Sequence, residues 1–151
     1  MHSGRVHEVL SHISDRLEED TDWAVIGSCN MLLHGMEVEP NDVDIITTSD
    51  GIRVFENKFS HLVKKPLEVQ DNFGEESSES LKLVLEIGGV EVEVIGEGPE
   101  GSYIERGLER RENVRMDGGE FPCIPLETDA EAYRLMGREE KAERIREFLE
   151  G

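Results

Sequence analysis

Apolar residues recur along the first part of the chain with the spacing of helices and short strands. Between residues 3 and 19 they follow one another at three- and four-residue intervals, the stripe of an amphipathic helix that packs on a core. The run WAVIG, residues 23–27, is short, apolar and closed by glycine, and residues 28–35 are compatible with a helix that stops at glycine. The pattern therefore predicts a helix, then a strand, a tight turn and a second helix.

Polar and apolar residues alternate in the next segment, NDVDIITT at residues 41–48. A strand here would place the carboxylates of Asp42 and Asp44 on one face and the intervening apolar side chains on the other. The alternation predicts a half-buried strand with two acidic groups side by side.

Residues 50–63 return to helical spacing, and Ser49 or Asp50 is available as the N-cap. The stretch 70–80, QDNFGEESSES, is polar and rich in glycine and serine. Such a composition is typical of a surface loop, and this loop could act as a mobile flap.

Two hairpins are indicated in the second half of the chain. LKLVLEI (81–87) and VEVEVI (90–95) flank a Gly-Gly pair, which a type I′ turn favours. In NVRMDGGEFPCIP (113–125), the DGG triplet could turn two more strands, and Pro122 suggests an edge strand. The second hairpin would extend the same sheet.

The chain ends in two predicted helices between residues 126 and 149, with Gly137 as the break between them. No internal repeat and no interdomain linker is evident in the 151 residues. The elements predict one α/β (α+β) domain over residues 1–151, with a mixed sheet flanked by helices and C-terminal helices from about residue 126.

Charge changes the picture of possible partners. The chain has 35 acidic and 16 basic residues and a formal net charge of -19, which disfavours binding to duplex DNA or to an anionic membrane. An anionic ligand would need metal ions or a few placed cations beside it.

Cysteine usage and the first residues bear on the compartment. Cys29 and Cys123 show no CxxC spacing, so we expect reduced thiols and no zinc site. Neither a membrane-spanning apolar run nor the plan of a secretory signal is present, and a cytoplasmic location is the expectation.

The most informative chemistry lies in Gly27, Ser28, Asp42 and Asp44. A D-x-D pair has little weight alone in so acidic a chain, but this pair follows a strand, a Gly-Ser turn and a short helix. Gly27 has no side chain to obstruct a phosphate, and Ser28 can donate to one at the start of a helix. Two carboxylates on a strand can share a hard divalent cation.

The order WAVIGSCNMLLHG and then PNDVDII resembles the hG[GS]…DhD signature, where h is apolar, of the polymerase-beta-type nucleotidyltransferase superfamily. It is most similar to the minimal, single-domain members. The resemblance implies that Gly27 and Ser28 contact the triphosphate of a nucleoside triphosphate (NTP). It also implies that Asp42 and Asp44 bind Mg²⁺ or Mn²⁺.

The superfamily pattern expects a third carboxylate, often aspartate, on a later strand. Glu93 in GVEVEVIG is the candidate, and Glu91 on the same face is the alternative. Glu93 would be a metal ligand or the general base. The segment GREEKAERIREFL resembles a helix that offers a basic residue to the phosphates, here Lys141, although Ala142 stands where an acid is common.

The implied function is metal-dependent transfer of a nucleoside monophosphate from an NTP to a hydroxyl of a small molecule or a protein, with release of pyrophosphate. Two alternatives stay open at this point. One is a noncatalytic nucleotide-binding or protein-interaction module, antitoxin-like, that retains the fold. The other is an acidic α/β domain without a nucleotide site, whose paired acids are solvated strand faces. His34 and Cys29 are expected to be structural.

Overall fold

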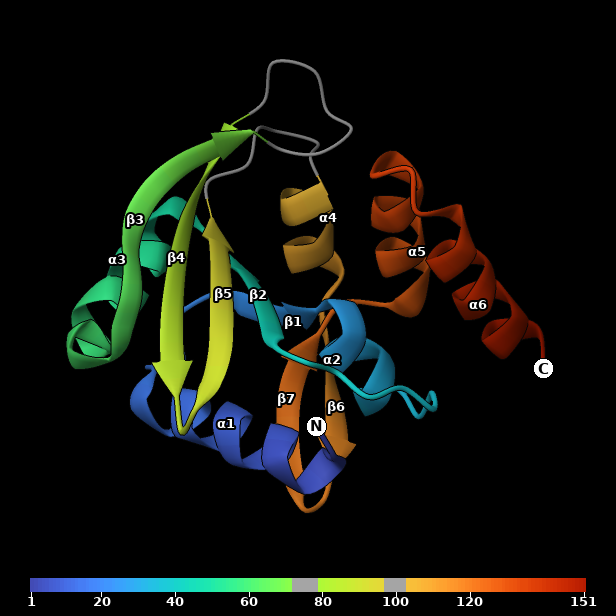
Figure 1. Ribbon diagram of the computed structural model, residues 1–151, viewed down its shortest axis with the longest axis horizontal. Coiled ribbons are helices and arrows are strands. Elements are labelled where there is room, and N and C mark those ends of the chain that lie inside the picture. The colour runs from blue at the N-terminus through green and yellow to red at the C-terminus, as the bar shows by residue number, and fades with distance from the viewer. Residues whose placement is uncertain (72–78, 97–102) are drawn as a thin grey trace.

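A mixed sheet runs through the protein in the computed structural model, which describes residues 1–71, 79–96 and 103–151 (Figure 1). Within these ranges the strands are β1 (Trp23–Ile26), β2 (Val43–Thr47), β3 (Val63–Asp71), β4 (Glu79–Ile87), β5 (Val90–Gly96), β6 (Glu112–Met116) and β7 (Gly119–Cys123). They lie in the order β3-β4-β5-β2-β1-β7-β6. Pairing is antiparallel except between β2 and β5 and between β1 and β7.

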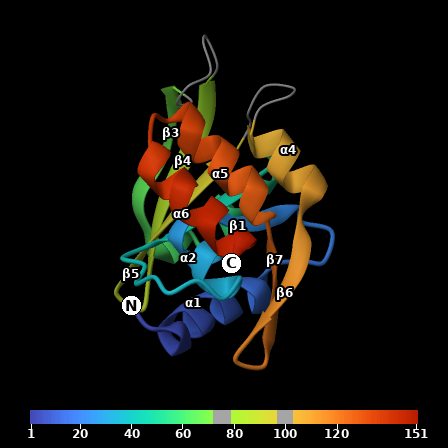
Figure 2. The ribbon, with the colours of Figure 1, turned by 90° about the vertical axis from the view of Figure 1, so that its right-hand side faces the viewer.

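Helices cover both faces of this sheet. The helices of the described ranges are α1 (Ser3–Arg16), α2 (Gly27–Leu33), α3 (Ser49–Lys58), α4 (Tyr103–Arg110), α5 (Leu126–Leu135) and α6 (Glu139–Glu150), with a short 3₁₀ helix, η1 (Ser60–Leu62). The side chains of α1 and α3 join one apolar cluster with the sheet, and those of α4 and α5 join another. Figure 2 shows α5 and α6 in front of the sheet and α1 below them. The predicted α/β (α+β) class with a mixed sheet is confirmed.

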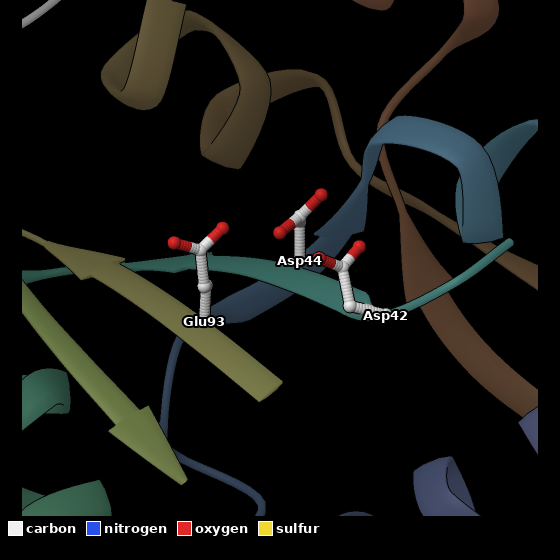
Figure 3. A group of neighbouring side chains, drawn as sticks. All are labelled: Asp42, Asp44 and Glu93. Atoms are coloured by element: carbon white, nitrogen blue, oxygen red, sulfur yellow. The ribbon is translucent and has the colours of Figure 1, made fainter. Parts of the chain in front are cut away.

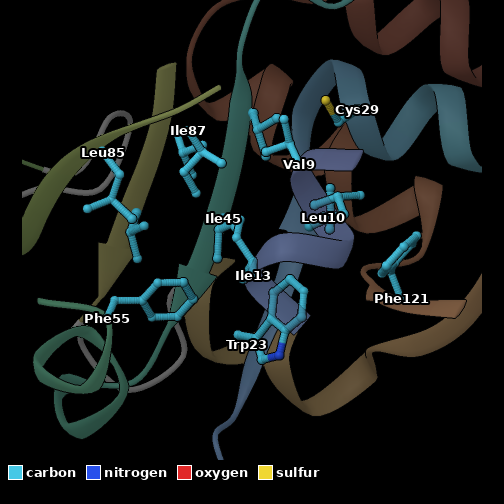
Figure 4. Packing of buried hydrophobic residues seen from close by; sticks show 14 of the residues in the cluster. Val9, Leu10, Ile13, Trp23, Cys29, Ile45, Phe55, Leu85, Ile87 and Phe121 are labelled. Atoms are coloured by element: carbon cyan, nitrogen blue, oxygen red, sulfur yellow. The ribbon is translucent and has the colours of Figure 1, made fainter. Parts of the chain in front are cut away.

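The main core lies between the sheet and helices α1 and α3 (Figure 4). Leu10 and Ile13 of α1 and Phe55 of α3 are fully buried there, and each contributes about 1.5–3 kcal/mol through removal of apolar surface from water. Ile45 of β2 points into the same core, whereas the side chain of Asp44 is on the opposite face. The alternation predicted for this strand is therefore confirmed.

The opposite face is covered only in part. Ile26 and Ile46, on β1 and β2, pack against Ile104 of α4 and Ala132 of α5. Helices α2, α5 and α6 form a third apolar cluster beside the sheet, which includes Tyr133. The neighbouring part of β2 and β5 stays open, and the polar groups of the site lie there.

Both predicted hairpins form and belong to one sheet. Gly88 and Gly89 have φ of 57° and 81°, the left-handed conformations that a type I′ turn requires. The second hairpin joins β6 to β7. The edge predicted at Pro122 is wrong, because β6 is the edge strand and β7 lies inside it. Proline is tolerated because β7 pairs with β1 only at Cys123, one residue later.

The region after β2 differs most from prediction. Thr48, not Ser49 or Asp50, caps α3, because its hydroxyl accepts a hydrogen bond from the Gly51 N–H at 2.9 Å. The helix predicted to reach residue 63 ends at Lys58, and the chain then enters the edge strand β3. Most of the predicted loop 70–80 lies outside the described residues, so the flap is untested.

The C-terminal helices break at Gly137, as predicted, with φ of 79°. Helix α4 was not anticipated from the sequence. In the part of the chain that the structure describes, no helix has the length and apolarity needed to cross a bilayer.

Candidate functional site

Strand pairing brings the predicted site residues together. In the antiparallel pair of β1 and β2, Ile26 lies opposite Asp44, so the turn into α2 begins at Gly27 beside that carboxylate. In the parallel pair of β2 and β5, Asp44 lies opposite Glu93. The register of three central strands thus places the glycine turn, an aspartate and a glutamate at one point.

Three carboxylates converge there: Asp42, just before β2, Asp44 and Glu93 (Figure 3). One oxygen from each lies within 4.8 Å of the others, and all three side chains are half-buried. The Asp44 Oδ1 atom is buried and has no hydrogen-bond partner in the described structure. Like charges this close repel one another unless a proton or a cation stands between them.

The carboxyl groups respond to this crowding in different ways. Burial, followed by the charge of Asp42 and a hydrogen bond with Glu93, raises the pKa of Asp44 to about 8. Burial and the charges of Glu93 and Glu91 also raise the pKa of Asp42. Without a cation, the cluster therefore holds a proton on Asp44 at neutral pH.

Glu93 stays ionised in this cluster. Burial by itself raises its pKa, but hydrogen bonds from Lys82 and Asp44 outweigh it, so the pKa of Glu93 is lowered. The Lys82 Nζ atom lies 2.6 Å from Glu93 Oε1. Glu91, the alternative third acid, lies outside the cluster and pairs with Lys64 at 3.2 Å.

Gly27 occupies a position that other residues would not fit. Its φ is +73°, and a Cβ atom there would lie 3.0 Å from Asp44 Oδ2. Its N–H donates to Asp129 Oδ1 at 3.2 Å and Oδ2 at 3.0 Å, so this donor is already used inside the protein. Ser28 follows, half-buried, and its side chain lines the cleft beside the carboxylates.

Asp129 is a member of the site that the sequence analysis missed. It is 3 % exposed on α5 and also accepts a hydrogen bond from Asn30 Nδ2 at 2.9 Å. Burial raises its pKa to about 7, although Asn30, the Gly27 N–H and Lys141 each lower it. In the sequence it is one acid among 35, and only its apolar neighbours in TDAEAY hint that it is buried.

These groups line a cleft of about 320 Å³. One wall is the Gly27-Ser28 turn and the carboxylate cluster, and the other comes from α5, α6 and the residues between them. Lys141 Nζ lies 5.3 Å from the centre of the Tyr133 ring on that second wall, with Arg138 nearby. The cleft therefore combines acidic, basic and aromatic surfaces.

Ala142, which replaces the expected acid, is fully buried among α2, α5 and α6 and does not reach this cleft. Cys29 Sγ donates to the Asp42 carbonyl at 3.3 Å, and burial raises the pKa of the thiol to about 12. His34 Nε2 lies 3.0 Å from the Ile124 carbonyl. Cys29 and His34 thus have structural contacts.

A second hollow of about 370 Å³ lies elsewhere, where α4 meets the end of β2. The ion pair of Arg111 and Asp22, at 2.6 Å, forms part of its lining. In the described parts of the chain only Asp42, Asp44 and Glu93 form a possible metal-ligand group, and they line the first cleft. We therefore assign the chemistry to the first cleft.

Comparison with known proteins supports the same assignment of fold. A family model described as aminoglycoside-2''-adenylyltransferase matches residues 6–149. The crystal structure of TM1012 from Thermotoga maritima, assigned provisionally as a nucleotidyltransferase, is 31% identical with a TM-score of 0.77, over 99% of this chain and 96% of that one. No curated protein matches.

Two structures of the enzyme ANT(2'')-Ia share the fold at lower identity. One is a crystal structure in complex with adenylyl-2''-tobramycin, 15% identical with a TM-score of 0.55, covering 95% of this chain and 94% of that one. The other is a solution structure of this antibiotic-resistance factor, with the same identity and TM-score, covering 98% and 90% of the two chains.

Proposed function

Since this chain belongs to the aminoglycoside-2''-adenylyltransferase family, and so to the nucleotidyltransferases, we propose that it transfers a nucleoside monophosphate from an NTP to a hydroxyl of a small molecule. Pyrophosphate is the second product of this reaction. The observation that carries the proposal is the convergence of Asp42, Asp44 and Glu93 beside the Gly27-Ser28 turn in one cleft.

The residues present fit a divalent metal ion. Asp44 Oδ1 is a buried acceptor without a partner, and three carboxylate oxygens within 4.8 Å of one another match the oxygen ligands that Mg²⁺ and Mn²⁺ prefer. Asp42 and Asp44 would hold the ion, and Glu93 would lie beside it. A bound ion would neutralise charge on the phosphate oxygens and on the departing pyrophosphate.

The cleft also offers groups for the triphosphate. The Ser28 hydroxyl lines the cleft and has no hydrogen bond within the described structure, so it is available as a donor to a phosphate oxygen. Lys141 and Arg138 would pair with the phosphates from the other wall. Gly27 allows close approach because it has no side chain, while its N–H stays on Asp129.

Glu93 is the residue that we propose as proton acceptor. Lys82 holds its Oε1 atom at 2.6 Å and keeps the carboxylate ionised. The Oε2 atom would accept the proton of the acceptor hydroxyl as that oxygen attacks the α-phosphorus in line. Asp42 and Asp44 would orient the reacting groups and would not exchange this proton.

The acceptor proposed is a small, hydroxyl-rich cation of the aminoglycoside class. This proposal comes from the family description and from the adenylylated tobramycin bound to ANT(2'')-Ia. The net charge of -19 supports it, since a strongly acidic protein attracts cations and raises their association rate.

The test is pyrophosphate release from each of the four NTPs with Mg²⁺ or Mn²⁺ across a panel of aminoglycosides and uncharged polyols. We expect release that depends on acceptor and metal, and that falls by about 10³-fold or more in Asp42→Asn and Asp44→Asn while both variants stay folded. Glu91→Gln is the matched control and should retain activity. Triphosphate binding without turnover on any acceptor would instead favour the noncatalytic module.

A further inference from the structure

Among the described residues, the hydrogen bonds to the buried carboxylate of Asp129 all come from one short segment that is far away in sequence. The Gly27 N–H reaches both of its oxygens, at 3.2 and 3.0 Å, and Asn30 Nδ2 reaches Oδ2 at 2.9 Å. Asn30 also donates to the Ile124 carbonyl at 3.1 Å and is itself fully buried. Asp129 therefore ties α5 to the turn between β1 and α2.

Burying a carboxylate to connect α5 to this turn is energetically unfavourable. Removing an ionised group from water is unfavourable unless donors replace the lost hydration, and neutral or apolar side chains would fill the same space at lower cost. Asp129 is 3 % exposed, and burial raises its pKa. This unfavourable burial suggests that Asp129 holds the geometry of the Gly27 turn and does more than stabilise the fold.

Asp129 acts on the peptide of Gly27, which precedes Ser28, the residue proposed to donate to the triphosphate. Gly27 has φ of +73°, and its peptide orientation helps to determine where the next residue, Ser28, points. The hydrogen bond from the Gly27 N–H to Asp129 opposes rotation of this peptide.

The same residue joins the two walls of the cleft. Asp129 and Tyr133 lie one turn apart on α5, and Lys141 packs over the Tyr133 ring. Both Tyr133 and Lys141 line the cleft opposite Ser28. The hydrogen bond from Gly27 to Asp129 therefore links the two walls of the cleft.

We propose that Asp129 is a positioning residue that, through Gly27 and Asn30, aligns Ser28 for the triphosphate of the NTP. This inference rests on the proposed function, because it assigns a role within the same cleft. Asp129 touches neither substrate nor metal in this role.

Asp129→Asn tests the proposal. The carboxamide oxygen can take the Oδ2 position and accept from Gly27 and Asn30, but its NH2 group then takes the Oδ1 position, 3.2 Å from the Gly27 nitrogen, where two donors repel each other. We would measure binding of α,β-methylene-ATP, which cannot transfer its nucleotide, and of AMP, both with Mn²⁺. The dissociation constant for the triphosphate should rise about tenfold or more, and that for AMP less than about threefold.

Ile13→Val is the matched control. It removes one buried methylene from α1, away from the cleft, and should lower the melting temperature without changing the ratio of the two dissociation constants. If Asp129→Asn raises the dissociation constants of both ligands by the same factor, or changes neither of them, Asp129 does not have the positioning role. Absence of any nucleotide binding to the wild-type protein overturns the proposed function, and this inference with it.

A measurement on the wild-type protein covers the case in which Asp129→Asn does not fold. The Gly27 amide proton should exchange slowly with solvent, and its NMR signal should move little when α,β-methylene-ATP and Mg²⁺ are added, whereas that of Ser28 should move. Fast exchange at Gly27, or a larger change at Gly27 than at Ser28, would show that the phosphate uses this donor and would contradict the proposal.

Discussion

Asp44 makes the affinity of the site for metal depend on pH in a defined way. Its pKa is raised to about 8 by burial and by Asp42, so at pH 7 about nine tenths of the metal-free protein carries a proton there. A divalent ion binds the ionised carboxylate and must displace this proton. Metal binding and proton release are therefore coupled at neutral pH.

The magnitude follows from the position of this pKa. Each pH unit below about 8 costs about 1.4 kcal/mol, a factor of ten in affinity, because Asp44 must first ionise. The apparent dissociation constant for Mn²⁺ should fall about fiftyfold between pH 6 and pH 8 and level off above that. Isothermal titration in two buffers of different ionisation enthalpy should count about 0.9 proton released per ion at pH 7.

Two variants show whether the proton comes from Asp44. Asp44→Asn should bind Mn²⁺ weakly and lose the pH dependence, whereas Glu91→Gln, on the neighbouring strand but outside the cluster, should keep both. An affinity that is constant from pH 6 to pH 8, with less than about 0.2 proton released, would show that metal binding displaces no proton from Asp44.

Three further predictions concern the same cleft. In metal-free buffer Asp44→Asn should raise the melting temperature at pH 8 and leave it unchanged near pH 4. The reason is that ionisation of a group with a raised pKa destabilises the folded state progressively from about pH 4 to pH 8. Equal melting temperatures of the wild-type and variant proteins at pH 8 would contradict this. Gly27→Ala should lower the free energy of unfolding, measured by chemical denaturation, by about 3 kcal/mol. Gly118→Ala should lower it by about 1 kcal/mol, because Gly118 has the same left-handed backbone but open space around it. Similar losses in the two variants would mean that Asp44 does not crowd Gly27. Lys141→Met should weaken triphosphate binding about tenfold while the surface variant Lys58→Met, measured by the same titration, leaves it intact; an equal effect of both would remove Lys141 from the site.

The predictable part of the fold was the part with strong local signals. The β4-β5 hairpin was evident because Gly88-Gly89 supplies two left-handed residues between alternating apolar runs. The break between the last two helices at Gly137 and the strand after Asp42 were also predicted from the sequence. In each case the local signal and the tertiary structure agree.

Other elements depend on contacts that no local pattern records. Strand β3 contains Lys64, Lys65 and Pro66 with little alternation, and it forms because β4 offers a free edge. Thr48, the residue after β2, is the N-cap in place of the two expected residues, because its backbone is extended and its hydroxyl accepts a hydrogen bond from the Gly51 N–H. Neither outcome could be read without the sheet.

The sequence pointed to the three carboxylates of the cluster, but it did not point to the buried residue Asp129, which binds the neighbouring turn. Asp42 and Asp44 were predicted from their order after a strand, a turn and a helix, and Glu93 from the resemblance to the superfamily; the structure brings all three together. Asp129 lies 102 residues from Gly27, and nothing in the spacing of the chain predicts that its carboxylate meets that N–H. Long-range burial decides such a contact, and sequence periodicity carries no record of it.

The proposed function requires the cleft to transfer a nucleoside monophosphate to a hydroxyl acceptor. Incubation with Mg²⁺, an aminoglycoside and NTP labelled on either the α- or the γ-phosphorus shows which group is transferred. We expect the α label to become covalently attached to the acceptor and the γ label to leave in pyrophosphate. Label from the γ-phosphorus on the acceptor, or no transfer from either position with any NTP, would contradict it.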